Sequence, residues 1–131
     1  IGRVDSRVEK MYEAVLKAQL LALSSLEEGE SAITPVNRVC DYLEGLGYST
    51  IRSGVRDRGF IHSLGHGVGW SLEDLPHLSH LSRDKLKRGH VVTLEPGLYD
   101  PQVGGVRVED VIAFTGRGVE ELSTFRKILK I

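Results

Sequence analysis

Three short stretches of the 131-residue chain carry one imidazole and two carboxylates in a setting that could bind metal ions. The stretches are Phe60–Gly69, Thr93–Tyr99 and Gly104–Asp110, and the residues are His66, Glu95 and Glu109. Imidazole nitrogen and carboxylate oxygen are donors that borderline and hard divalent ions accept. A bridged pair of ions needs more donors than these three, so the sequence predicts part of a metal site and not a whole one.

In their order and residue pattern, these stretches resemble the catalytic domain of the pita-bread metallopeptidases, the family of methionine aminopeptidase, Xaa-Pro aminopeptidase and Xaa-Pro dipeptidase. The resemblance runs from about Arg7 to the C-terminus. It is closest to the Xaa-Pro branch, whose Glu-Pro-Gly-hydrophobic-Tyr turn and Gly-Val-Arg-hydrophobic-Glu-Asp strand match Glu95–Tyr99 and Gly105–Asp110. The resemblance implies a hydrolase that cleaves short peptides before proline, as a dipeptidase or aminopeptidase.

The resemblance also implies a role for each matching residue. His66 and Glu95 would bind one metal, Glu109 would bridge two, and His62 would be a catalytic histidine on the substrate side. Glu95 would in addition accept the proton of the attacking water. The cofactors implied are two divalent ions, Mn, Co, Fe or Zn. From the residues alone, His62 is equally well a hydrogen-bonded loop histidine.

The family's two remaining ligands are aspartates on strands that would precede Ile1. Two divalent ions bring four positive charges, whereas His66, Glu95 and Glu109 offer two negative ones. We therefore expect this chain alone to bind one ion weakly or none, and not to hydrolyse peptides.

Glu73 stands where the family pattern has a further histidine, seven positions after His66. A carboxylate cannot donate a hydrogen bond at neutral pH unless burial raises its pKa. The alternative function is therefore a non-catalytic pita-bread module that binds peptide or protein, because a binder can lose a transition-state contact more easily than a hydrolase.

The composition narrows the class of protein. A formal charge of -1 and an even mixture of acidic and basic residues argue against nucleic-acid binding. No run approaches the length of about 20 apolar residues that crosses a membrane. Cys40 is the only cysteine, which excludes an internal disulfide and predicts a buried free thiol in a reducing, cytoplasmic setting.

Hydrophobic periodicity predicts two helices followed by strands. The first helix is expected from a cap at Asp5–Ser6 to about Leu26, with a stop at Gly29. The second is expected from a Thr34 hydroxyl cap before Pro35 to Gly47.

The rest of the chain is predicted to form a sheet. The expected extended segments are Phe60–Leu64, His90–Glu95, Val106–Phe114 and a last strand near Val119–Leu122, with Leu75–Lys87 as a loop or short helix. If the second and third segments pair antiparallel, Glu95 and Glu109 can point into a common pocket. Arg107 shares the face of Glu109 and is expected to hold that carboxylate in orientation, whereas Asp110 faces the other way.

Residues 1–131 are thus predicted to form a single partial domain of the α+β class, with two helices packed on a mostly antiparallel sheet. The resemblance implies the C-terminal half of a pita-bread domain, with the N-terminal half missing. A lone half would expose the apolar sheet face and strand edge that its partner covers, so we expect a homo-oligomer, a dimer or higher.

Overall fold

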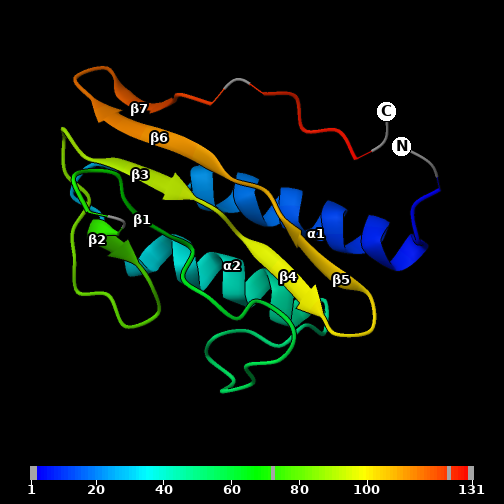
Figure 1. Ribbon diagram of the computed structural model, residues 1–131. Coiled ribbons are helices and arrows are strands. Elements are labelled where there is room, and N and C mark those ends of the chain that lie inside the picture. The colour runs from blue at the N-terminus through cyan, green and yellow to red at the C-terminus, as the bar shows by residue number, and fades with distance from the viewer. Residues whose placement is uncertain (1–2, 72, 124, 130–131) are drawn as a thin grey trace.

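The computed structural model describes residues 3–71, 73–123 and 125–129, and within them two helices lie on one face of an antiparallel sheet (Figure 1). This arrangement confirms the predicted α+β class. The main sheet has five strands in the order β2-β1-β3-β6-β7, and β4 and β5 form a second, two-stranded sheet. The elements are α1 Ser6–Leu23, α2 Ile33–Gly45, β1 Gly65–Gly67, β2 Asp74–Leu78, β3 Val91–Leu94, β4 Gly97–Asp100, β5 Gly104–Arg107, β6 Asp110–Thr115 and β7 Gly118–Glu121.

Helix α1 begins at the predicted cap. The Asp5 side chain accepts a hydrogen bond from the backbone N–H of Arg7, and its hydrogen bonds with Arg7 lower the pKa of that carboxyl to about 2. The helix ends at Leu23, three residues before the predicted end. Ser24 and Ser25 explain the difference, because both hydroxyls donate to carbonyl groups of the preceding turn and so compete with helical hydrogen bonding.

Helix α2 begins at Ile33, and the predicted Thr34 cap is wrong. The Thr34 hydroxyl donates to the Glu30 carboxylate at 3.0 Å instead. Pro35 is tolerated because an N–H in the first helical turn has no helical partner. Past the end of the helix, Gly47 adopts the left-handed conformation with φ 87°, as the predicted glycine stop requires.

The predicted strand Val106–Phe114 is broken into β5 and β6. The break lies opposite Glu95–Pro96, and Pro96 has no N–H to donate to the ladder, although its carbonyl accepts from the Val108 N–H at 3.4 Å. The register nevertheless continues without a shift from the Leu94–Asp110 pair to the Gly97–Arg107 pair. The two sheets therefore form one long bent ribbon, as β3–β4 and β6–β5 show in Figure 1.

Two further predictions of strand position need correction. Asp74–Leu78 forms strand β2, which was expected to be loop or helix; its Pro76 is tolerated because β2 is an edge strand. In Phe60–Leu64, Phe60 makes only an isolated bridge to Thr50, and regular pairing starts at Gly65. The last strand, β7, lies where it was predicted.

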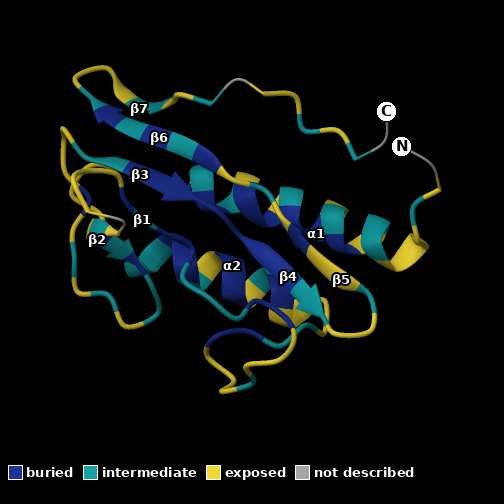
Figure 2. Cartoon of the chain, in the orientation of Figure 1, coloured by how far each residue is buried: buried dark blue, intermediate teal, exposed yellow. Residues whose placement is uncertain are grey.

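The hydrophobic core lies between the helices and the ribbon (Figure 2). Cys40 is buried within it as a free thiol, as predicted, and burial raises the pKa of that thiol. Neither described helix has the length and apolar character needed to cross a membrane. The largest fully buried side chains are Val15, Val36, Val39, Leu43, Phe60, Leu64, Leu78, Leu86, Val92, Leu94, Leu98 and Ile112.

Candidate metal and peptide site

His66 and Glu95 meet on the ribbon, where β1 lies beside β3. The His66 Nδ1 atom is 2.9 Å from the carbonyl oxygen of Gly67, and a carbonyl can only accept, so Nδ1 carries the proton in the neutral ring. The lone pair is then on Nε2, which lies 3.4 Å from Glu95 Oε1. Both side chains are largely buried, with 20% and 12% of their surface exposed. The structure therefore brings one imidazole nitrogen and one carboxylate oxygen to the same small volume.

The 3.4 Å separation suits two ligands of one metal ion. Two ligand atoms that each lie about 2.1 Å from a tetrahedral ion are about 3.4 Å from each other. The donor types and their spacing therefore fit a divalent ion as they stand, with the Nδ1 hydrogen bond fixing the ring in the orientation that a ligand histidine needs.

Thr93 connects these two residues, and sequence reasoning did not identify it as a site residue. Its hydroxyl accepts from the His66 backbone N–H at 3.1 Å and donates to Glu95 Oε1 at 3.0 Å. The only signal in the sequence was the alternation of β3, which places Thr93 on the same face as Glu95.

Glu109 lies directly opposite Glu95 in the ribbon, because the register runs unbroken across the interruption. The strands that carry the two glutamates are thus neighbours, as predicted. The side chain of Glu109 is nevertheless exposed. In the described part of the chain, no three His, Cys, Asp or Glu side chains gather closely enough to hold a metal. The structure thus brings the side chains of His66 and Glu95 into contact, whereas Glu109 lies next to them in the ribbon with its side chain exposed.

The Arg107 side chain approaches the carboxylate of Glu95 and not that of Glu109. Its Nη1 atom lies 3.6 Å from Glu95 Oε2, and half of the Arg107 side chain is exposed. We expected it to orient Glu109, but the long side chain crosses the ribbon to the opposite carboxylate. Asp110 faces away from this site, as predicted: it is buried and forms an ion pair with Lys127.

His62 is held by its own set of contacts. Its Nδ1 atom donates to the Ser63 carbonyl at 2.7 Å, which leaves Nε2 to accept from the Tyr99 hydroxyl at 3.1 Å. The rings of Phe60 and Tyr99 lie edge-on to the imidazole, with centroids 5.3 and 5.4 Å away. The side chain is thus a hydrogen-bonded loop histidine, and its contact with a substrate stays a prediction.

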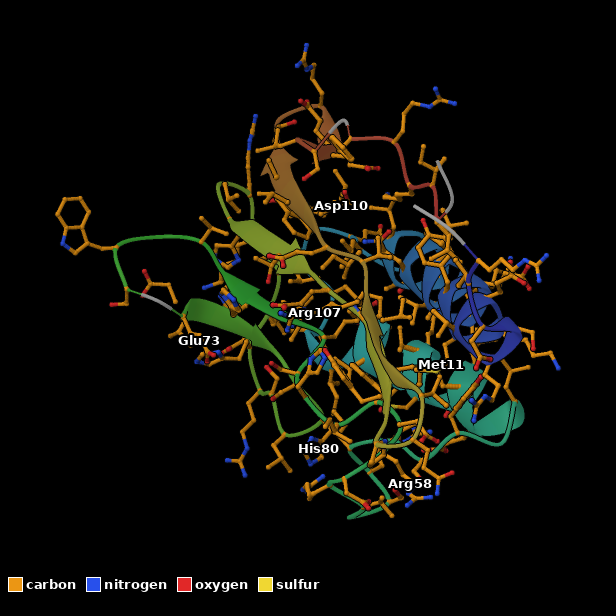
Figure 3. The ribbon with its side chains drawn as sticks, turned by 45° about the vertical axis from the view of Figure 1, so that its right-hand side comes forward. Met11, Arg58, Glu73, His80, Arg107 and Asp110 are labelled. Atoms are coloured by element: carbon orange, nitrogen blue, oxygen red, sulfur yellow. The ribbon has the colours of Figure 1, made fainter. Side chains whose placement is uncertain are left out.

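Glu73 is exposed in the turn between β1 and β2. Figure 3 shows it toward the outer end of this hairpin, apart from Arg107. Trp70, in the same turn, is fully exposed, so it belongs to the rim of the molecule and not to its core.

Comparison with known proteins agrees with this fold. Residues 1–116 match the profile of metallopeptidase family M24. An Xaa-Pro dipeptidase from Pyrococcus furiosus is 35% identical over 130 residues, which are 98% of this chain and 35% of that protein. An uncharacterised peptidase from Methanocaldococcus jannaschii is 39% identical over 123 residues, covering 91% of this chain and 33% of the relative.

Solved structures give the same result. The prolidase from Pyrococcus furiosus superposes with a TM-score of 0.83 at 36% identity, covering 96% of this chain and 35% of that one. The Xaa-Pro dipeptidase from Bacillus anthracis superposes with a TM-score of 0.85 at 33% identity, covering 98% and 34%.

The fold is that of a pita-bread domain, of which this chain forms the C-terminal part. The chain belongs to metallopeptidase family M24. It spans about a third of the length of the relatives that it matches.

Proposed function

We propose that this chain is the C-terminal part of a metal-dependent Xaa-Pro dipeptidase or aminopeptidase, and that it is inactive in isolation. The observation that carries the proposal is the 3.4 Å separation of His66 Nε2 and Glu95 Oε1. The names of the similar proteins support the choice of the Xaa-Pro branch. We propose equally that residues 1–131 form a single partial domain and that the parent protein supplies the N-terminal half.

In the parent protein, His66, Glu95 and Glu109 would hold two divalent ions, Mn, Co, Fe or Zn. When bound, such ions supply a Lewis acid for the peptide carbonyl and lower the pKa of a water. Glu95 accepts the proton of the attacking water, because its carboxylate is already aimed at the shared volume. His62 contacts the peptide, and Arg107 holds the second oxygen of Glu95.

The test compares this chain with a version extended upstream, each with added Mn²⁺ and with an Xaa-Pro dipeptide and an Xaa-Ala dipeptide as substrates. We expect no turnover by the short chain and proline-dependent turnover by the long one. Glu95→Gln and Glu109→Gln should abolish the turnover by the long chain, while Glu28→Gln, on an exposed residue in the loop between α1 and α2, should not. Turnover by the short chain that chelator and Glu109→Gln both remove would refute the proposed inactivity.

A second candidate function is a non-catalytic module that binds peptide or protein. The exposed carboxylate of Glu73, where the family pattern has a histidine, favours it. Two aspartates on adjacent upstream strands would favour the enzyme. An extended protein that binds Xaa-Pro peptides without cleaving them would favour the module.

The homodimer and the cytoplasmic setting stay predictions. Register places Val68, Val91 and Ala113 in one row on the sheet face away from the helices, and Leu122 lies further along that face. Val68 and Leu122 are 49% and 53% exposed, which supports a surface available to a second copy. A monomer in light scattering at micromolar concentration would count against the dimer.

A further inference from the structure

We propose that Thr93 is a positioning residue for the metal ligands: its buried hydroxyl fixes Glu95 Oε1 so that this oxygen faces His66 Nε2. The inference rests on the proposed function and adds a residue to it. Thr93 is 5% exposed, and its hydroxyl is hydrogen-bonded on both sides.

The direction of these hydrogen bonds follows from the chemistry of the groups. The His66 backbone N–H can only donate, so the Thr93 hydroxyl accepts from it. Its single proton is then available to Glu95 Oε1, which as a carboxylate oxygen accepts. The hydroxyl thereby links the backbone of one ligand to the side chain of the other.

The consequence is an orientation of the carboxylate. A carboxylate oxygen has two lone-pair directions, and Thr93 occupies one of those on Oε1 at 3.0 Å. Arg107 lies near the other oxygen, Oε2, at 3.6 Å. His66 Nε2 lies 3.4 Å from the same Oε1 atom, a separation that suits two ligands of one ion.

Close packing of the strands makes this arrangement possible. A Cβ atom on Gly65 would lie 2.0 Å from the Thr93 carbonyl oxygen and 3.2 Å from its Oγ1. Only glycine therefore lets β1 approach β3 closely enough for the His66 N–H to reach the hydroxyl. Residues that orient metal ligands typically change metal affinity by about 10- to 100-fold when they are removed.

The test uses Thr93→Val, which keeps the shape and removes the hydroxyl, and Thr93→Ser, which keeps the hydroxyl. In the extended protein, Mn²⁺ affinity is measured from the free Mn²⁺ signal in electron paramagnetic resonance. We expect Thr93→Val to weaken binding by about 10-fold or more and Thr93→Ser to stay within about 3-fold of wild type. Valine with wild-type affinity would overturn the inference.

A second measurement on the present chain needs no metal. The ¹³C signal of the Glu95 carboxyl carbon and the ring signals of His66 are compared in the two variants. We expect Thr93→Val to move the Glu95 signal and Thr93→Ser to restore it; an unmoved signal in the valine variant would contradict the role. If the wild-type extended protein binds no Mn²⁺, the proposed function fails, and the carboxyl signal alone decides the role of Thr93.

Discussion

Replacing Gly65 by alanine should separate the two strands that hold the site. The added Cβ would lie 2.0 Å from the carbonyl oxygen of Thr93 and 2.8 Å from its carbonyl carbon, both backbone atoms that no rotamer change can move. Ordinary contact between such atoms is about 3.5 Å, so β1 and β3 must separate by about 1.5 Å. That displacement breaks the arrangement of His66, Thr93 and Glu95.

The size of the effect follows from the hydrogen bonds that this separation strains and from the overpacking itself. Two ladder hydrogen bonds of 2.8 Å flank the position, from the Glu95 N–H to Leu64 and from the Val68 N–H to Val91. Each contributes about 0.5–1.5 kcal/mol, and overpacking costs about 1–3 kcal/mol. Alanine recovers about 0.4–1 kcal/mol by restricting the unfolded chain. Taken together, these contributions predict that Gly65→Ala lowers the free energy of unfolding by about 1–5 kcal/mol.

Gly45→Ala is the matched control, since it makes the same chemical change at the end of α2. An added Cβ there meets no atom within 4 Å, so alanine should raise stability by about 0.5–1 kcal/mol. Urea unfolding followed by circular dichroism measures both changes. Equal effects of the two substitutions, or a loss below about 0.5 kcal/mol for Gly65→Ala, would show that the strand approach is not as tight as we infer.

Two further predictions concern an ion pair and the exposed turn. Burial lowers the pKa of Lys127, but its hydrogen bonds to Asp110 and Glu121 outweigh that effect, and the net pKa is raised. The ion pair of Lys127 therefore stabilises the fold fully at pH values below the ordinary lysine pKa. This stabilisation is lost as the pH rises through the raised pKa of Lys127 in the folded state. Lys127→Met should cost about 1.5–3 kcal/mol in urea unfolding at pH 7 and less at pH 11, whereas a difference that stays constant with pH would contradict the ion pair. In the extended protein, Glu73→His should raise kcat more than it changes KM in a peptidase assay; an unchanged kcat would mean that the position no longer serves catalysis.

The sequence predicted the elements better than it predicted their ends. The helical stripes on both helices were visible because burial on one face repeats with the helical period. The ends were harder to predict because they depend on single side-chain hydrogen bonds. The Ser25 hydroxyl helps to end α1, and the Thr34 hydroxyl turns to Glu30 instead of capping α2. Such choices are decided by local geometry that periodicity does not contain.

The meeting of His66 with Glu95 was predictable in part. The resemblance to the family's sequence motifs singled out both residues. The antiparallel pairing of β3 with β6, continued by that of β4 with β5, sets Glu95 opposite Glu109. The contacts of the long or small polar side chains were not predictable. Arg107 crosses to Glu95, and Thr93 bridges two residues that are distant in sequence, because both depend on how closely the strands approach.

The charge around the His66–Glu95 pair explains why we expect the isolated chain to bind metal poorly although its donors are well spaced. Glu95 and Glu109 bring two negative charges, and the Arg107 guanidinium, 3.6 Å from Glu95 Oε2, offsets part of them. The negative charge that remains is too small to balance the four positive charges of two divalent ions, so their mutual repulsion at short range is largely uncompensated. Metal binding therefore needs both correctly spaced donors and enough negative charge. In this chain Thr93 and Gly65 support the spacing, whereas the additional negative charge would have to come from upstream carboxylates. An extension that supplies them should raise Mn²⁺ affinity even where the distance between His66 and Glu95 stays the same.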